Sequence, residues 1–321
     1  TVGYDNVFMG YTAGYSNSSG GDNVAIGSGA SVTNTVGGNN TAVGFNAMYY
    51  NTSSNNVAMG YKALFTNTTG TQNVAIGQVA LTYNTTGLYN TAVGAGSLQN
   101  NTTGVYNTAL GYAALISTTI GYYNTGCGMQ SFQSNITGVG NTGLGFQTGY
   151  TNSSGSYNIF IGQQAGYNNT SADYNTGVGY NSLTSNTTGV RNTAIGANSL
   201  TTNTIGAYNV ALGFYTLYYN TTGSNNTAAG YAALVNNTTG SYLTAYGFYS
   251  LQANTTGQYN IAVGYQSLNY NTIGSYNTGL GYQALYSNTT ASYNTAVGHL
   301  ALYGNTSGQG NIAIEIGRAH V

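Results

Sequence analysis

The chain has 321 residues, of which only 2% are charged, and its formal net charge is −1. It therefore has no electrostatic field that would capture nucleic acid or anionic lipid, and we expect neither as a partner. A hydrophobic fraction of 41% with almost no charge is atypical of a disordered chain, and no apolar run is long enough to insert into a membrane.

An internal repeat of 17 residues runs through almost the whole chain. Its consensus is Asn-Thr-Ala-Val-Gly-Tyr-x-Ala-Leu-x-x-Asn-Thr-Thr-Gly-x-Tyr, and its members are called repeat positions 1 to 17. One step, from Gly44 to Gly60, is 16 residues long. The glycine of position 5 recurs at residues 10, 27, 44, 60, 77, 94, 111, 128, 145, 162, 179, 196, 213, 230, 247, 264, 281 and 298.

Each repeat begins with a predicted strand and ends with a predicted turn. Positions 1 to 4 are rich in β-branched residues, which favours a strand that extends at most to position 6; the first is expected at 6–9 and the last at 311–314. Asn-Thr-Thr-Gly at positions 12 to 15 is typical of a turn. Frequent glycine excludes long helices. The sequence therefore predicts an all-β fold, a parallel β-solenoid (β-roll) of about 18 coils with 17 residues per coil, in a single array over 1–314.

Stacked coils place identical residue types above one another, so each repeat position becomes a ladder. Buried side chains and hydrogen-bonded amides are expected in the structural ladders, whereas the tyrosines of positions 6 and 17 can stack and offer a contact surface. The predicted structural ladders include Asn23, Asn73, Asn90, Asn107, Asn260, Leu64, Leu81, Leu234, Leu285, Gly77, Gly94 and Gly264. The possible contact surface includes Tyr61, Tyr112, Tyr180, Tyr231, Tyr265 and Tyr282.

The two sides of the strand leave two arrangements open. Positions 2 and 4 are bulky and largely apolar, whereas positions 3 and 5 are small. In one arrangement the small residues lie inside the coil and the bulky ones face another subunit. In the other, positions 4 and 9 form the core and position 3 is a flat outer surface. Leu243 and Tyr246 break the consensus in one coil, where we expect local widening.

The C-terminal heptapeptide, residues 315–321, departs from the repeat, since Glu315 stands where the next glycine is due. Its sequence resembles the in-frame translation of a widely used sequencing adapter. We therefore predict that 315–321 is a non-native tail at the end of a metagenomic fragment of a longer protein. A genuine basic tail is the alternative.

The Asn-x-Ala-Val/Ile-Gly core, as in 23–27 and 73–77, resembles the head repeat of trimeric autotransporter adhesins and is also similar to repeats of phage tail-fibre proteins. The resemblance covers 6–314. It implies a parallel β-roll, a homo-oligomer of three chains and an adhesive role at the cell surface, or a fibre shaft in a virion. The adhesin unit is typically shorter, and no stalk or membrane anchor is present in this chain.

Few residues have side chains suited to catalysis or metal binding, and we expect no enzyme activity, cofactor or metal. Asp5 and Asp22 share position 17 in adjacent coils, where they could hold a cation but are better explained as substitutions in a solvated turn. Asp173 is isolated. His299 is expected on the surface, and Cys127 as a buried small residue and not a nucleophile.

The remaining functional hypotheses concern the surface. Asn-Thr-Thr at positions 12 to 14 forms sequons, as at Asn67 and Asn254, which indicate either glycans or turn chemistry alone. Threonine columns could order water, as in ice-binding solenoids. Tyrosine ladders could contact carbohydrate. We therefore predict a structural and adhesive segment of an extracellular fibrous adhesin, with a phage tail-fibre shaft and an ice-binding β-solenoid as alternatives.

Overall fold

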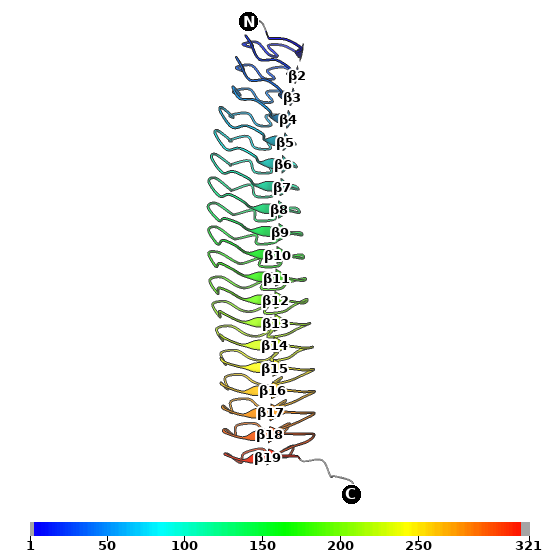
Figure 1. Cartoon of the computed structure of the whole chain (residues 1–321), viewed down its shortest axis with the longest axis vertical. Helices are drawn as coiled ribbons and strands as arrows, with labels where there is room; N and C mark the ends of the chain where they lie inside the picture. The colour runs from blue at the N-terminus through cyan, green and yellow to red at the C-terminus, as the bar shows by residue number, and fades with distance from the viewer. Residues whose placement is uncertain (1–2, 316–321) are drawn as a thin grey trace. The chain divides into compact units, whose positions relative to one another are not determined.

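The computed structural model of the protein describes residues 3–315, and all of the regular elements in that range are β-strands of three residues. The strands recur at the repeat period and stack in parallel, so the protein is the all-β solenoid that the sequence predicts (Figure 1). The chain divides into two compact units, Thr1–Asn158 and Ile159–Val321. The predicted tail lies outside the described residues except for Glu315, whose backbone N–H donates to the carbonyl of Val297 at 2.8 Å.

Strands of the first unit pair residue for residue with the next strand along the chain. Val74 lies opposite Thr91, and Thr91 lies opposite Thr108. The in-register stack follows directly from the constant repeat length. The strands are β1 Val7–Met9, β2 Val24–Ile26, β3 Thr41–Val43, β4 Val57–Met59, β5 Val74–Ile76, β6 Thr91–Val93, β7 Thr108–Leu110, β8 Thr125–Cys127 and β9 Thr142–Leu144.

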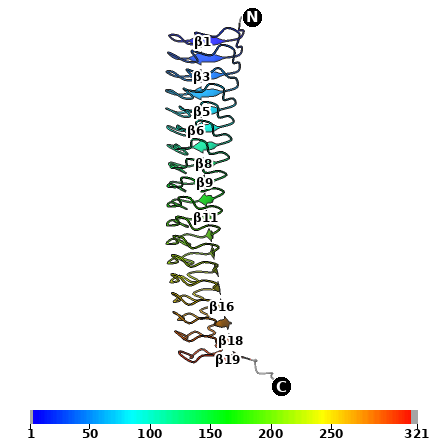
Figure 2. The same ribbon diagram turned by 90° about the vertical axis from the view of Figure 1, so that its left-hand side faces the viewer.

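Strands of the second unit follow the same pattern. Thr193 lies opposite Val210, which lies opposite Thr227. In the view of Figure 2 the strands β16, β18 and β19 again succeed one another in chain order. The strands are β10 Ile159–Ile161, β11 Thr176–Val178, β12 Thr193–Ile195, β13 Val210–Leu212, β14 Thr227–Ala229, β15 Thr244–Tyr246, β16 Ile261–Val263, β17 Thr278–Leu280, β18 Thr295–Val297 and β19 Ile312–Ile314.

Each strand covers only repeat positions 2 to 4, because the glycine of position 5 leaves the extended conformation. Gly77 has a φ of +132°, which L side chains rarely adopt. A Cβ at Gly77 would lie 2.6 Å from the carbonyl oxygen of Gly94 in the next coil, too close for any side chain. Steric contact between coils therefore requires glycine at position 5. The strand was predicted at positions 1 to 4, so the observed strand is one residue shorter, because position 1 is not part of it.

Left-handed backbone also occurs in non-glycine residues, at positions 7, 9 and 17. In one coil, Val79, Leu81 and Tyr89 have φ values of 52°, 49° and 58°. Such a conformation costs an L-residue roughly 1–2 kcal/mol, so it persists only where the coil compensates for it. The backbone N–H of Leu81 donates to Ser97 at 3.0 Å, and its side chain is fully buried. Tertiary burial and coil-to-coil bonding thus override the local preference.

The core of each coil consists of small residues at positions 3 and 8 and leucine at position 9. Ala92, Ser97 and Leu98 are fully buried, whereas positions 2 and 4 are half-buried or exposed. The arrangement with small residues inside is therefore correct, and the alternative that placed position 4 in the core is wrong. The leucines predicted to form a structural ladder are all fully buried, namely Leu64, Leu81, Leu234 and Leu285.

Larger core residues are matched by glycine within the same coil. Phe160 replaces the alanine of position 3 and is fully buried, while Gly166 replaces the leucine of position 9. A Cβ at Gly166 would lie 2.4 Å from Cζ of Phe160, so the phenyl ring occupies the space that leucine fills elsewhere. Phe8 and Gly14 form the same exchange. Where one coil has glycine at both positions, as at Gly143 and Gly149, the buried ring of Phe132 from the preceding coil fills the space. Core volume is therefore conserved within a coil or between neighbouring coils, as close packing demands.

Two asparagine ladders connect successive coils. At position 1, Oδ1 of Asn90 accepts the backbone N–H of Asn107 at 2.9 Å, and Nδ2 of Asn107 donates to the carbonyl of Gly121 at 2.8 Å. At position 12, Nδ2 of Asn220 donates to Oδ1 of Asn203 at 2.8 Å. The first ladder is confirmed at the predicted residues, which are all buried: Asn23, Asn73, Asn90, Asn107 and Asn260. The second was predicted only as a turn.

The two irregular coils leave the stack undisturbed. Thr227 donates to the carbonyl of Leu243 at 2.8 Å and Thr244 donates to Asn260 at 2.9 Å, the same lengths as in regular coils. The predicted widening at Leu243 is therefore wrong, because a leucine still fits the buried position 1. In the 16-residue coil the turn is one residue shorter, and the carbonyl of Ser53 accepts the amides of Asn40 and Asn51 at 2.8 Å in place of a glycine carbonyl.

Candidate functional site

An uncharged surface covers the outer side of the strands in both units, with mainly apolar side chains at repeat position 4 and valine, isoleucine or threonine at position 2. We name it the strand face: the side chains of repeat positions 2 and 4. They point outward because alternate residues of a strand lie on opposite sides and the alanine of position 3 points inward. Leu110 and Leu144 are 48% and 49% exposed in the first unit, and Ile195 and Leu212 are 44% and 39% exposed in the second. The strand face carries no charged side chain in the described strands.

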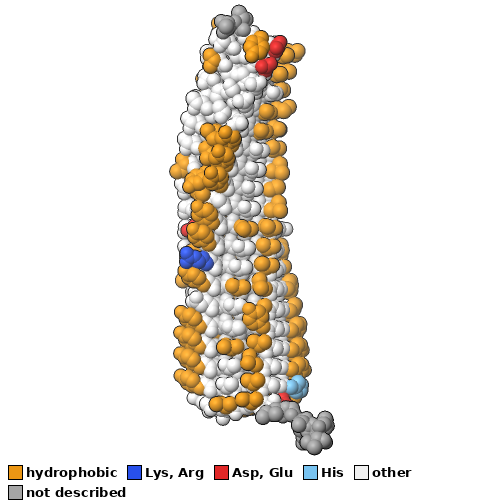
Figure 3. Space-filling model, viewed as in Figure 1, with side chains coloured by type: hydrophobic (Ala, Val, Ile, Leu, Met, Phe, Trp, Pro, Cys, Tyr) orange, Lys and Arg blue, Asp and Glu red, His pale blue; other side chains and the backbone are white. Residues whose placement is uncertain are grey.

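Aromatic rings of position 6 stack along the coils. In the second unit the run begins at Phe214, and neighbouring ring centroids are between 5.1 and 5.7 Å apart. It passes through Tyr231 and Tyr265 and ends at His299, which lies 5.1 Å from Tyr282. The six predicted contact tyrosines are all exposed, and Figure 3 shows hydrophobic side chains in rows separated by uncharged surface. The predicted stacking at position 6 is therefore confirmed for Tyr61, Tyr231, Tyr265 and Tyr282, whereas the neighbouring coils of Tyr112 and Tyr180 carry no aromatic residue at this position.

A second aromatic column follows position 17. The rings of Tyr242 and Tyr259 are 4.9 Å apart and almost parallel, at 3°. Arg191 replaces a tyrosine in this column, and its guanidinium lies 5.4 Å from the Tyr208 ring and 5.7 Å from the Tyr174 ring. It also donates a hydrogen bond to the hydroxyl of Tyr208. The planar guanidinium therefore continues the stack where a ring is missing.

The geometry of these stacks limits what they can bind. Rings that lie parallel at about 5 Å cover one another's faces, so a ligand meets ring edges and phenol hydroxyls. The expected stacking of sugars onto these tyrosines is therefore available only where a run is interrupted. One such interruption lies in the first unit.

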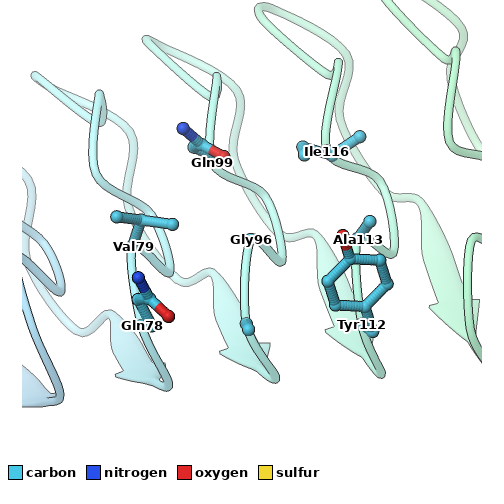
Figure 4. A pocket seen from close by; sticks show the side chains of 8 residues that line it. Gln78, Val79, Gly96, Gln99, Tyr112, Ala113 and Ile116 are labelled. Atoms are coloured by element: carbon cyan, nitrogen blue, oxygen red, sulfur yellow. The ribbon is translucent and has the colours of Figure 1, made fainter.

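A hollow of about 220 Å³ lies where the position 6 column is interrupted in the first unit. We name it the slot. Ala95 and Gly96 replace the larger residues of positions 6 and 7, and Figure 4 shows side chains of three successive coils around Gly96. The slot is lined by Gln78, Val79, Ala95, Gly96, Gln99, Tyr112, Ala113 and Ile116. Sequence reasoning named Tyr112 but missed the slot, although Ala-Gly at these positions is a detectable departure from the consensus.

The sequons of positions 12 to 14 are turn chemistry. Asn67 and Asn254 are fully buried, and the Nδ2 of each donates to an asparagine Oδ1 of the preceding coil, at 2.6 and 2.8 Å. The threonine that follows Asn254 is also engaged, since Oγ1 of Thr255 donates to the carbonyl of Thr272 at 3.1 Å. The folded coil therefore does not present these amide nitrogens for glycan attachment.

The few titratable residues other than tyrosine include two aspartates, a histidine and a cysteine. Asp5 and Asp22 are exposed at position 17 in left-handed backbone, and His299 is exposed at the end of its stack. The free Cys127 is only half-buried, because position 4 faces outward, so its predicted burial is wrong. Among the described residues no three His, Cys, Asp or Glu side chains group to hold a metal ion.

The phenols of Tyr249 and Tyr286 both have raised pKa values, and the larger shift is that of Tyr286. A side-chain hydrogen bond with Tyr270, followed by partial burial, raises the pKa of Tyr286 to about 12. The two rings meet edge to face with centroids 5.0 Å apart. The hydrogen bond favours the neutral phenol.

These features define a class of protein. Parallel in-register strands, asparagine ladders and stacked aromatic columns make the chain a β-solenoid repeat protein. Neither the family models nor the curated proteins contain a match to it. Within 3–315 no helix has the length and apolarity needed to cross a membrane.

Proposed function

We propose that the chain is a structural and adhesive segment of an extracellular fibrous protein, in which copies of the chain pack against one another through the strand face. The observation that carries this proposal is the exposure of that face. Large contiguous apolar patches are rare on monomeric proteins and typically mark interaction surfaces. A surface almost free of charge adds no repulsion between copies.

Identical copies would meet ladder to ladder. Closed rotational symmetry is the usual arrangement of homo-oligomers, and the resemblance to autotransporter heads suggests three chains. Burial of a leucine or isoleucine of the strand face contributes roughly 1.5–3 kcal/mol, so a few rungs suffice to offset the entropy of association. A tail-fibre shaft would use the same packing in a virion, and an anchor or a chaperone domain in the flanking gene would separate the two.

Sedimentation equilibrium tests the assembly. We expect the parent chain to sediment as three copies and the double variant Ile195→Lys, Leu212→Lys to sediment as one, because lysine on the strand face places like charges opposite one another. Thr222→Lys is the matched control, since Thr222 is exposed in the turn outside the strand face. Circular dichroism establishes that each variant is folded. A parent that sediments as one chain at every concentration would contradict the proposal.

One observation favours ice binding as a second candidate. Thr91, Thr108, Thr125 and Thr142 occupy position 2 of four successive strands and pair in register. Their hydroxyls therefore recur at the strand spacing, about 4.8 Å, on an uncharged surface. We expect thermal hysteresis that falls when Thr108 and Thr125 are replaced by leucine. Freezing behaviour equal to that of an inert protein would rule this candidate out.

A further inference from the structure

The interrupted aromatic column creates a site with its own chemistry. We propose that the slot between Gln78 and Tyr112 binds a single neutral pyranose ring of a glycan. This inference deepens the adhesive part of the proposed function and rests on it. It is carried by three observations: an open floor, an unstacked aromatic ring and two side-chain amides without partners.

The floor of the slot is open because of Gly96. The nearest atoms to a Cβ at Gly96 would be Cδ1 of Ile116 at 3.4 Å, Oε1 of Gln99 at 3.7 Å and Cα of Ala113 at 4.0 Å, which are ordinary contact distances. Gly29 occupies the same repeat position in an earlier coil, but there Oδ1 of Asn46 already fills the space that a Cβ would take. Glycine at position 7 therefore does not by itself produce a hollow. The hollow forms because Ala95 and Gly96 are both small and no neighbouring side chain fills the space.

The ring of Tyr112 is available to a ligand. Ala95 precedes it in the column and Met129 follows it, so Tyr112 stacks on no aromatic ring among residues 3–315. It is 58% exposed, whereas the stacked Tyr231 and Tyr265 are 43% and 42% exposed. An aromatic surface beside a hollow suits the apolar C–H side of a sugar, which the covered faces of the stacked runs cannot accept.

Two amides supply the polar contacts. The side chains of Gln78 and Gln99 lie on adjacent coils at the slot, and neither amide has a hydrogen-bond partner within the described part of the chain. Each offers one acceptor and two donors, which matches the hydroxyls of a sugar. An aromatic side chain of a peptide would leave both amides unpaired, which favours the sugar. The lining contains no charged residue, so a neutral sugar is preferred to an acidic one.

The size of the slot limits the ligand to one ring. Pockets for drug-sized ligands are typically about 300–1,000 Å³, and the slot, at about 220 Å³, is smaller and open to solvent. A ligand of this size with few contacts binds weakly, with a Kd on the order of 1 mM. Useful adhesion then requires several slots, as in an assembly of identical chains.

Saturation-transfer NMR with the full chain and the methyl glycosides of glucose, galactose, mannose and N-acetylglucosamine tests the site. We expect transfer to at least one glycoside, strongest at the C–H groups of one sugar face. Ala95→Tyr should reduce it at least tenfold, because the new ring would stack on Tyr112 and fill the slot. The side chain is common at position 6, so the variant is expected to fold. Gln78→Ala and Gln99→Ala should each weaken the transfer severalfold.

Thr86→Tyr is the matched control, because it adds the same side chain at an exposed turn of the same unit, and its binding should equal that of the parent. Three outcomes would overturn the proposal. The first is no saturation transfer to any of the four glycosides at concentrations well above the expected Kd. The others are an equal loss of transfer in Ala95→Tyr and Thr86→Tyr, or binding of p-cresol without binding of any glycoside. Sedimentation reports the assembly separately. If three chains assemble but bind no glycoside, the sugar-binding proposal is refuted and the proposed structural role is not.

Discussion

The exchange of core volume between Phe160 and Gly166 makes a quantitative prediction. Phe160→Ala alone should destabilise the protein by about 3–5 kcal/mol, because it empties the space of a fully buried ring in a coil that has no leucine to fill it. Gly166→Leu alone should also destabilise, by roughly 1–3 kcal/mol or more, since its Cβ would lie 2.4 Å from the ring.

The double variant should be close to the parent, within about 1.5 kcal/mol, because the coil then carries the consensus pair seen at Ala194 and Leu200. Leucine is compatible with the backbone, since Gly166 has a φ of 61° and Leu200 has a φ of 49°. The predicted coupling between the two substitutions is on the order of 3 kcal/mol or more and opposite in sign to the single effects.

Urea unfolding followed by circular dichroism gives the ranking of the four proteins, and amide hydrogen exchange near Thr176 shows whether the loss is confined to neighbouring coils. Repeat arrays do not always unfold in two states, so the comparison uses both measurements. Additive losses, with the double variant the least stable of the four, would refute the volume exchange.

Two further predictions concern ionisation. Asn220→Asp should destabilise by several kcal/mol at neutral pH, because the new carboxylate would face Oδ1 of Asn203 at 2.8 Å in a fully buried ladder. Burial raises the pKa of that carboxyl above the value of about 3.9 for free aspartate, so the variant should be most like the parent below that pH and lose stability as the pH rises. Asn225→Asp, at an exposed residue of the same coil, is the control and should behave like the parent in urea titrations across pH. Because the folded pKa of Tyr286 is about 12 against 10.0 for a free phenol, the stability it contributes is complete below pH 10 and is lost as the pH rises toward 12. Tyr286→Phe should reduce the alkaline loss of stability, and unchanged alkaline unfolding would count against the hydrogen bond with Tyr270.

The repeat predicted the fold because its constant period determines both the length of each coil and the register between neighbouring strands. A constant step of 17 residues places Val74 beside Thr91, so register needs no further information. The burial of Leu98 and the asparagine ladder at position 1 also followed from side-chain type and period alone. The same reasoning left open which side of the strand is buried, since alternation shows that two sides differ without showing which is covered.

The rest depends on backbone conformation and on contacts between coils. Left-handed Leu81 and Tyr89 run against local preference and are not visible in a sequence pattern. Asn67 belongs to both a turn and a sequon, and only the coil above it shows that its amide is taken. To predict the slot, one would have needed to know that Tyr112 lies beside Ala95 and Gly96 and that no side chain fills the space above them. The prediction of widening at Leu243 was wrong because leucine replaces the hydrogen bonds of the asparagine side chain with apolar contacts, and the backbone does not move.

Side-chain hydrogen bonds of the array either close a turn within one coil, as from Asn220 to Gly223, or connect neighbouring coils, as in Asn107 with Asn90 and with Gly121. A coil thus interacts only with its two neighbours, and these hydrogen bonds do not depend on the total number of coils. Unequal recombination between repeats of the gene would insert or remove whole rungs while keeping every remaining bond. The number of coils can therefore change between generations one coil at a time, while the hydrogen bonds between the remaining coils are kept.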